Sequence, residues 1–310
     1  MYDVIGDVHG SHDALRRLLM RMGYVKGPHG YSHSERQAIF VGDLLNRGNA
    51  VGKVIKLVRR MQDGGAAQVV MGNHEFNTLA YHIRKPNRKS AYLRPRSKKN
   101  RKQLSATLKQ LSKEEIRSTL SWIRDLPMYL DLPQIRVVHA CWDPWAIRKI
   151  EKAYAEFGQW TDEFMHKALT PTKKLARAVE WTLKGKEQRL PVGKGLTDLD
   201  GFYRRRLRVR WYLPPEGKTY AEYALVRDNH LPEIPLPRKL DDAPCPYAES
   251  EKPVFIGHYG LRPNPEPALL ASNVACIDYG VARGDVLCAY RWDGEKTLET
   301  DHLVWVNVSS

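Results

Sequence analysis

The sequence predicts an α/β fold, and two features of its first eighty residues support this prediction. Short apolar segments that end in glycine alternate with segments whose apolar residues recur at helical spacing. Such an alternation is typical of a sheet of mainly parallel strands that is covered by helices. The chain has 310 residues, 42% of them hydrophobic, so it can bury a sizeable core within one large domain with insertions or within two modest domains.

The expected elements follow one another along the chain. Residues 2–6 (YDVIG) are a short apolar run typical of a buried strand, and residues 11–22 place Leu15 and Leu18 at helical spacing behind the N-cap candidate Ser11. The same patterns predict strands at 38–42 and 68–72 and helices at 51–61 and 75–82.

The pattern becomes less regular after residue 82, where long segments mix helical patterns with proline-rich connections. Helices are expected around 103–124, and strand patterns return at 135–140, 254–257, 275–278 and 286–292. We therefore expect a single domain over residues 1–310, in which insertions at about 83–132 and 145–250 could form a cap.

Composition excludes several classes of protein. No apolar run approaches the roughly 20 residues that span a bilayer, and the first residues lack the basic and apolar regions of a secretory signal. The four cysteines are far apart without a CxxC pair, which excludes a zinc ribbon and favours reduced thiols in a cytoplasmic protein. The net charge of +15 indicates attraction to polyanions such as nucleotides, nucleic acid or acidic protein, without deciding among them.

Polar side chains follow five of the expected strands. In open α/β sheets, ligands gather at the carboxyl ends of the strands, so we expect these side chains to converge. Their oxygen and imidazole donors, without thiolates, suit Mn²⁺, Fe²⁺ or Zn²⁺ better than a structural cysteine-rich zinc site. Each motif alone is weak, because an Asp after a strand is often only a helix N-cap; six such residues in order make coincidence improbable. They are Asp7, His9, Asp43, Asn73, His139 and His258.

Their motifs resemble a known family. GDVHG (6–10), GDLLNRG (42–48), GNHE (72–75), His139 and GH (257–258) are similar to the ordered motifs of the calcineurin-like metallophosphoesterase superfamily. Within it, they resemble the phosphoprotein phosphatase branch, which includes bacterial dinucleoside tetraphosphate hydrolases. The resemblance covers the core at about 1–82, 135–144 and 253–293. It implies an α/β sandwich of two facing β-sheets flanked by helices, with helical or irregular insertions and the site at one edge.

The resemblance also implies a dinuclear metal site. Asp7, His9 and Asp43 would hold the first metal, and the second would be held by Asp43, Asn73, His139 and His258. Asp43 would therefore bridge, which suits a carboxylate because it carries negative charge between two cations. Two divalent ions, Mn²⁺ first and Fe²⁺, Zn²⁺ or Ni²⁺ as alternatives, would activate a bridging hydroxide for direct attack on phosphorus.

Three further residues receive catalytic roles from the same resemblance. Arg47, together with Asn73, would contact phosphate oxygens, although an arginine here could also be a surface ion-pair residue. His74 would protonate the leaving-group oxygen. Asn46 stands where related phosphatases usually have Asp; it can still hydrogen-bond to His74 but supplies no negative charge, so we expect His74 to have a lower pKa than in an Asp-paired relative.

Two basic segments remain open to more than one interpretation. Residues 84–102 are expected to be a solvated loop, and the alternative is that they cover the site and contact polyphosphate or RNA. Residues 204–210 (RRRLRVR) could form an exposed strand. The neighbouring Trp211 and Tyr212 could stack on a base, but packing in a core is the commoner role.

These observations predict a bacterial, cytoplasmic metal-dependent phosphoesterase that hydrolyses phosphate esters or anhydrides. Its substrates are expected to be phosphorylated small molecules or nucleotides, dinucleoside polyphosphates above all. The first alternative is a Ser/Thr-type phosphoprotein phosphatase. The second is a non-catalytic phosphatase-like protein that binds RNA or nucleotide. No membrane association is expected.

Overall fold

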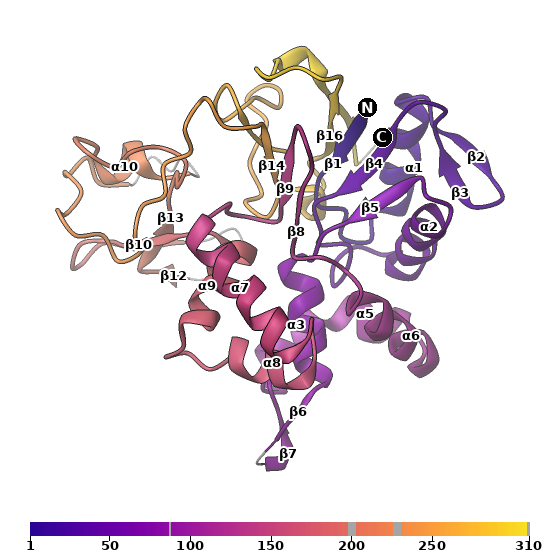
Figure 1. Ribbon diagram of the computed structural model, residues 1–310, viewed down its shortest axis with the longest axis horizontal. Coiled ribbons are helices and arrows are strands. Elements are labelled where there is room, and N and C mark those ends of the chain that lie inside the picture. The colour runs from indigo at the N-terminus through magenta and orange to yellow at the C-terminus, as the bar shows by residue number, and fades with distance from the viewer. Residues whose placement is uncertain (87, 198–202, 226–230, 309–310) are drawn as a thin grey trace. The chain divides into compact units, whose positions relative to one another are not determined.

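The computed structural model describes residues 1–86, 88–197, 203–225 and 231–308. The chain forms two compact units (Figure 1). The main unit comprises residues 1–183 and 252–310, and the second unit comprises residues 184–251. Asn87, 198–202 and 226–230 of the expected insertions lie outside the described residues.

The first sheet of the main unit has five strands in the order β17-β16-β1-β4-β5. Strands β1, β4 and β5 run parallel, as the alternating pattern predicts, whereas β16 is antiparallel to β1 and β17 to β16. The strand β17 is not among the expected elements. The strands are β1 (Tyr2–Ile5), β4 (Gln37–Phe40), β5 (Ala67–Val69), β16 (Val286–Trp292) and β17 (Leu303–Asn307).

The second sheet has four strands in the order β15-β14-β9-β8, of which β9, β14 and β15 are parallel and β8 is antiparallel to β9. The strands expected at 275–278 and 286–292 therefore belong to different sheets. The strands of this sheet are β8 (Tyr129–Asp131), β9 (Arg136–Val138), β14 (Val254–Ile256) and β15 (Val274–Cys276).

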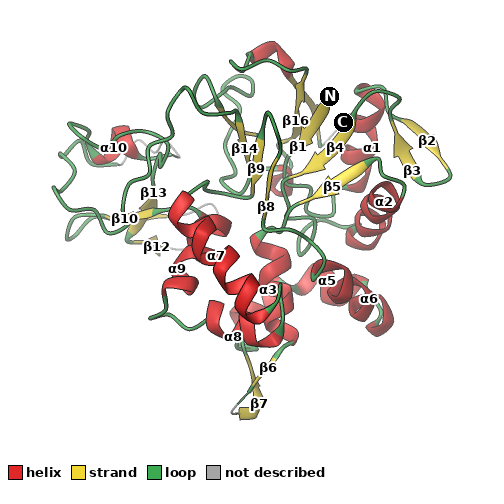
Figure 2. Cartoon of the chain, viewed as in Figure 1, coloured by secondary structure: helices red, strands yellow, loops and turns green. Residues whose placement is uncertain are grey.

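The two sheets pack face to face, which confirms the predicted sandwich. Val4 and Ile39 of the first sheet and Val137, Phe255 and Ala275 of the second belong to one fully buried apolar cluster. Apolar burial of this kind is the main force that holds layers together. Figure 2 shows helices, in red, beside the strands, in yellow, of the main unit.

A second apolar cluster joins the first sheet to its helices. It combines Ile5 and Phe40 with Leu15 of α1 and with Val54 and Val58 of α2, so the helical spacing seen in the sequence marks the buried faces. Apart from 3₁₀ turns at Val281–Arg283 and Thr300–His302 and a hairpin of β2 (Val25–Gly27) and β3 (Gly30–Ser32), the rest of this unit is largely helical. Its helices are α1 (His12–Arg21), α2 (Val51–Asp63), α3 (Asn73–His82), α4 (Lys98–Gln103), α5 (Ser105–Gln110), α6 (Lys113–Ile123), α7 (Pro144–Phe157), α8 (Asp162–Ala168) and α9 (Lys174–Lys184).

The basic segment 84–102 begins as a hairpin of β6 (Arg84–Lys85) and β7 (Arg88–Tyr92), which Figure 1 shows. It then continues into α4. The guanidinium of Arg96 lies 3.5 Å from the centre of the Tyr92 ring. Arg84, Lys85 and Arg96 are exposed, as expected of a solvated segment, but the segment forms a hairpin and a helix where a loop was expected. Contact of this segment with substrate stays a prediction.

The second unit contains two short antiparallel strand pairs and a short helix. The strand expected within 204–210 is present as β13, and Trp211 and Tyr212 beside it are buried, so they pack in a core. Whether the insertions cap the site stays a prediction. The elements are β10 (Glu187–Arg189) paired with β13 (Arg206–Arg208), β11 (Leu196–Thr197) paired with β12 (Tyr203–Arg204), and α10 (Tyr220–Tyr223).

No helix in the described part of the chain is long and apolar enough to cross a membrane. All four cysteines are free thiols, and three of them are buried.

A buried charge cluster joins the edges of β1, β4 and β16. The carboxylate of Asp3 is fully buried and accepts hydrogen bonds from Arg36 Nε at 2.9 Å and Arg291 Nε at 3.2 Å. Arg36 also donates to the carbonyl oxygens of Tyr2 and Trp292. Arg36 also pairs with Asp293, so removal of Asp3 would leave Arg36 buried with one of its two carboxylate partners and would leave Arg291, which is 30% exposed, without this partner.

Replacing Asp3 with alanine should therefore lower the free energy of unfolding by at least about 2 kcal/mol. Urea titration of the variant and the native protein measures the difference. Glu114→Ala is the matched control, because its ion pair with Arg117 is 74% exposed on both sides and should contribute less than about 1 kcal/mol. Equal effects of the two substitutions would contradict a structural role for Asp3.

Candidate metal centre

The six predicted ligands come from the carboxyl ends of five strands in the two sheets. Asp7 and His9 follow β1, Asp43 follows β4, and Asn73 follows β5 in the first sheet. The second sheet contributes His139 after β9 and His258 after β14. All lie within the main unit, and all are buried except the half-buried His258.

Asp43 lies at the centre of these side chains. Its Oδ2 atom is 3.4 Å from His139 Nε2, 3.7 Å from His9 Nε2 and 3.9 Å from His74 Nε2. It belongs to two groups that could hold a metal ion, one with His9 and His74 and the other with His139 and His258; in each group the candidate ligand atoms lie within 4.8 Å of one another. A carboxylate shared by two such groups lies where a ligand that bridges two metal ions would have to lie.

The remaining predicted ligands join the same cluster. Asp7 Oδ2 is 3.8 Å from His9 Nε2, and the Asp7 carboxylate accepts a hydrogen bond from the backbone N–H of His258. Asn73 Oδ1 lies 3.2 Å from His139 Nε2 and 2.6 Å from His258 Nδ1. The structure thus brings together all six side chains that the sequence singled out.

Backbone carbonyls orient two of the imidazoles. His9 Nδ1 lies 3.0 Å from the carbonyl oxygen of Leu45, and His139 Nδ1 lies 2.7 Å from that of Val41. Because a carbonyl only accepts, Nδ1 carries a proton in both rings, and Nε2 is directed toward Asp43, where its lone pair can bind a metal ion. This arrangement of an outer hydrogen bond and an inward lone pair is typical of histidine ligands to metals.

The site strains its own backbone. His9, Asp43, Asn46 and His258 have φ values of 46°, 52°, 71° and 70°; among the described non-glycine residues, Trp160 alone shares a positive φ with them. Such conformations cost about 1 kcal/mol or more for residues with a Cβ and persist only when the surroundings impose them. They follow three of the five strands, β1, β4 and β14, and their concentration here marks these strand ends as a functional region.

The electrostatics of the cluster suit divalent cations. Burial raises the pKa of Asp7, and the nearby carboxylates of Asp278 and Asp43 raise it further. Burial also lowers the pKa of His9 and brings the pKa of His74 to about 3, so both rings are neutral and can donate a lone pair. Against the effect of burial, the Asp43 carboxylate raises the pKa of His139. Imidazoles packed around crowded, buried carboxylates form a donor set that fits two divalent metal ions.

Comparison with known proteins gives the family. The sequence profile of the calcineurin-like phosphoesterase family matches residues 2–183, more than half of the chain. The chain belongs to this family. It is a hydrolase that acts on phosphate esters or anhydrides, and the family's dinuclear site uses divalent metals.

Two relatives and one solved structure show how far the similarity extends. A symmetrical bis(5'-nucleosyl)-tetraphosphatase of Actinobacillus succinogenes is 25% identical over 304 residues, 94% of each chain. A protein of the same name from Aromatoleum aromaticum is 27% identical over 316 residues, 95% of this chain and 94% of the other. A cold-active protein tyrosine phosphatase of a psychrophilic Shewanella species shares the fold, with a TM-score of 0.50, 17% identity, and coverage of 96% of this chain and 80% of the other.

Glu75 also belongs to this phosphoesterase site, although no role was predicted for it from its motif. Its fully buried carboxylate accepts hydrogen bonds from the backbone N–H groups of Asp43 at 2.8 Å, Leu44 at 2.9 Å and Gly72 at 3.1 Å. Burial raises its pKa to about 7. Glu75 therefore ties the loop after β4 to the start of α3, and its place in the GNHE motif was the available signal.

The first insertion supports the loop that carries Arg47. Thr107 Oγ1 of α5 accepts a hydrogen bond from the backbone N–H of Asn46. The Gln110 side chain accepts from Val51 N at 2.8 Å and donates to the carbonyl oxygen of Gly48 at 3.0 Å. Gln110 thereby caps α2, which has no side-chain cap of its own. No pattern in the sequence links α5 to this loop.

Asn46 and Arg47 lie at the edge of the cluster. Asn46 Nδ2 donates to Thr78 Oγ1 at 2.8 Å and to the carbonyl oxygen of His74 at 3.2 Å. The expected hydrogen bond to His74 is thus to its backbone. Arg47 is half-buried, and its charge lowers the pKa of both His9 and His74, as a cation close to both rings must.

Gly257 allows the two sheets to approach at the site, which gives a test. A Cβ atom at Gly257 would lie 2.2 Å from Asp7 Oδ1 and 2.6 Å from Val41 Cγ2. Gly257→Ala should displace Asp7 or the neighbouring His258 and reduce the metal retained after dialysis at least about tenfold. Elemental analysis measures the retained metal.

Gly27→Ala is the control, because a Cβ there would meet only the Gly30 carbonyl oxygen, at 4.0 Å. Full metal content in Gly257→Ala would show that the close approach is not needed for the ligand set.

Proposed function

We propose that the protein hydrolyses dinucleoside polyphosphates with two divalent metal ions that are held by the six predicted ligands. Mn²⁺ is the first choice for these ions. The convergence of these side chains on Asp43 supports this proposal most strongly. Two relatives named as tetraphosphatases, which match along 94% or more of this chain, point to the same substrate class. Their bacterial sources favour a bacterial origin, and the free cysteine thiols favour the cytoplasm.

Each residue has a stated role in this proposal. Asp7, His9 and Asp43 hold one ion, and Asn73, His139 and His258 hold the other together with Asp43. When bound, the ions polarise the phosphoryl oxygens and lower the pKa of water. Arg47 binds phosphate oxygens, together with Asn73, and His74 donates a proton to the leaving-group oxygen.

The low pKa of His74 favours anhydrides over alkyl monoesters as substrates, because the two classes differ in how much their leaving groups need protonation. Burial lowers the pKa of His74 to about 3, and its neighbour Asn46 carries no charge that would raise it. The imidazole is therefore almost entirely unprotonated near pH 7 and has few protons to donate. A nucleotide leaving from a polyphosphate chain needs less protonation than the alkoxide of a serine side chain. The Ser/Thr-phosphoprotein phosphatase remains the second candidate, which a comparison of substrates can decide.

Metal removal and reloading tests the proposal. Protein stripped with EDTA should be inactive, and Mn²⁺ should restore hydrolysis of diadenosine tetraphosphate with a higher kcat/KM than for nucleoside triphosphates or phosphopeptides. Asp43→Asn should lower kcat at least about 1,000-fold, because the shared carboxylate is lost. Asp13→Asn, whose side chain is 85% exposed, is the control.

Full activity of Asp43→Asn would reject the metal assignment. A preference for phosphopeptides would reject the nucleotide substrate and leave the metal assignment in place.

Asn46→Asp tests proton delivery. A carboxylate beside His74 should raise the pKa of the imidazole, so kcat/KM for alkyl phosphates should rise relative to aryl phosphates, by about tenfold. The same change removes the hydrogen bonds that Asn46 donates to Thr78 and to the His74 carbonyl. Thr78→Val disturbs these contacts without adding charge and should leave the ratio unchanged. An unchanged ratio in Asn46→Asp would show that the amide does not limit proton transfer.

A further inference from the structure

Most of the net positive charge of the chain lies in one stretch of the main unit, residues 76–113. This stretch contains twelve Lys and Arg residues and no Asp or Glu, so it contributes +12 to the net charge of +15. It includes the end of α3, the hairpin of β6 and β7, and the helices α4 and α5. Ten of the twelve cations lie in residues 84–102, which we call the cationic arm.

The cations of the arm lie at the surface of the molecule. Among those whose side chains the structure describes, Arg94 is half-buried and the other eight are exposed. The described residues of the arm expose no large apolar side chain. In Figure 1, the hairpin of the arm extends beyond the helices of the main unit. The arm therefore presents a surface that is strongly charged and has no apolar patch.

Contacts that leave the charge in place order the arm against α3. Leu93 N donates a hydrogen bond to the Ile83 carbonyl oxygen at 2.9 Å, which closes the base of the hairpin. The guanidinium of Arg96 lies 3.5 Å from the centre of the Tyr92 ring and 4.9 Å from that of the Tyr81 ring. An aromatic ring attracts a guanidinium without cancelling its charge, as a carboxylate would. The arm is thus ordered and remains cationic.

Like charges are placed next to one another within the arm. Lys85 of β6 is directly opposite Arg88 of β7. In α4, Lys98 precedes Arg101 and Lys102 by three and four residues. Like charges at these positions destabilise a strand pair or a helix, and the stretch has no acidic residue of its own to offset them. A bound polyanion would relieve this repulsion.

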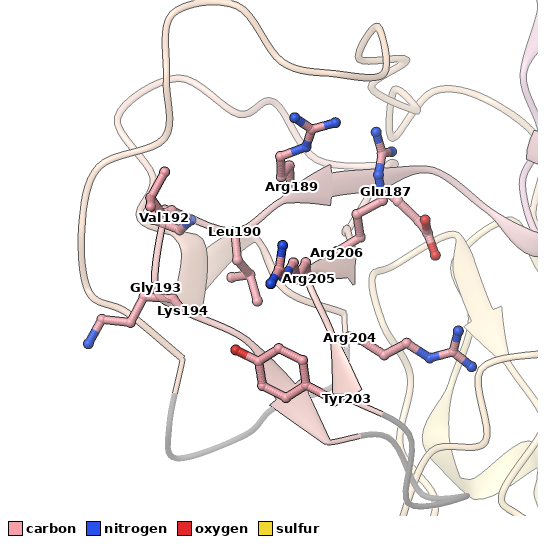
Figure 3. Close-up of a pocket in the computed structure, with 11 residues that line it drawn as sticks. Glu187, Arg189, Leu190, Val192, Gly193, Lys194, Tyr203, Arg204, Arg205 and Arg206 are labelled. Atoms are coloured by element: carbon pink, nitrogen blue, oxygen red, sulfur yellow. The ribbon is translucent and has the colours of Figure 1, made fainter.

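The second basic segment, residues 204–210, does not gather its charge in this way. It borders a cavity of about 780 Å³ in the second unit. In Figure 3, Arg205 is directed into this cavity, whereas Arg204 and Arg206 extend away from it. The carboxylate of Asp241 also lies close to this segment, with its Oδ2 3.8 Å from Arg206 Nη2. The second unit therefore offers basic residues for comparison with the arm.

We propose that the cationic arm binds the phosphate backbone of duplex DNA. Duplex DNA carries one negative charge per about 1.7 Å of its axis. The five residues of β7 extend over about 17 Å, so several phosphates can face the arm at once. A two-stranded hairpin fits the major groove of B-DNA, whereas the major groove of A-form RNA is too deep and narrow for side chains. This inference goes beyond the proposed hydrolysis and holds whichever substrate the metal centre uses.

Other polyanions fit the arm less well. Proteins hold single strands by exposed aromatic rings on which bases stack, but the ring of Tyr92 is half-buried and lies against Arg96. Membrane surfaces attract helices with an apolar face, and protein partners need apolar or aromatic anchors; the described residues of the arm expose no large apolar side chain. A small nucleotide needs a concave site, whereas this hairpin extends outward (Figure 1).

Fluorescence anisotropy of a labelled DNA duplex of about 20 base pairs tests the proposal with the full-length, metal-loaded protein. The duplex should bind more tightly than the same sequence as single-stranded DNA, single-stranded RNA or duplex RNA. Its affinity should fall at least about tenfold between roughly 50 and 200 mM NaCl, because phosphate contacts release counterions. EDTA should change the affinity less than about twofold, since the arm holds no metal ligand.

A double variant of the hairpin tests the role of the arm. Lys85→Gln with Arg88→Gln should weaken binding at least about tenfold and reduce the slope of log K against log[salt] by about 1.8, or about 0.9 for each lost phosphate contact. Arg238→Gln with Lys239→Gln is the matched control, because it also removes one Arg and one Lys, both exposed, from the second unit. The control should weaken binding less than about twofold.

The hairpin variant should remain folded, because it removes a repulsive pair from the surface. Urea titration should therefore show an unfolding midpoint equal to or above that of the native protein. A loss of DNA binding with an unchanged midpoint assigns the binding to the arm.

Several results would overturn the proposal. Absence of duplex binding at low salt would do so, as would equal weakening by the two double variants. Tighter binding of RNA or of single-stranded DNA would reject duplex DNA as the partner. Loss of binding in EDTA or in Asp43→Asn, with full binding in the hairpin variant, would place the DNA in the metal centre instead.

Discussion

The position of the Asp43 side chain is the constraint on which the metal centre depends. Its Oδ2 atom lies within 3.9 Å of three imidazoles, while Oδ1 accepts the backbone N–H of His74. Its backbone also joins loops, because its carbonyl oxygen accepts from His9 N and its own N–H donates to Glu75. One residue therefore fixes the relative positions of the loops after β1, β4 and β5, and any shift of that residue would move the ligands on both sides.

This arrangement requires backbone conformations and approaches that most residues resist. Four non-glycine residues of the site adopt left-handed φ values, and the loops touch where side chains are missing. A Cβ atom at Gly42 would lie 2.5 Å from Gly72 N, and one at Gly72 would lie 2.3 Å from Asp43 N. Local strain is tolerated because the buried sheets on both sides contribute far more stability than the few strained residues remove.

The two sheets contribute different chemistry to the centre. The first supplies the carboxylates and the second supplies His139 and His258, so the complete donor set exists only when the sandwich is packed. The apolar cluster between the sheets thus has a functional consequence: it sets the distance between the Asp43 carboxylate and the imidazoles of the second sheet. The apolar layer between the sheets therefore both stabilises the fold and determines the geometry of the site.

Much of the main unit could be predicted locally. The spacing of apolar residues and the glycines that end the apolar segments predict the parallel strands β1, β4 and β5 and the helices α1 and α2. Each of these elements buries one regular apolar face. The short strand β17 was missed, since five residues near the chain end give too little periodicity to separate a strand from a loop. Trp211 and Tyr212, which left two interpretations open, proved to be buried.

The sequence by itself determined which residue types could gather at the site, because their order after successive strands depends only on local patterns. Tertiary structure alone decided the roles of Gln110 and Thr107, which reach the Arg47 loop from about sixty residues away in the chain. Contacts of this kind depend on how distant segments of the chain pack together, so no local sequence pattern predicts them.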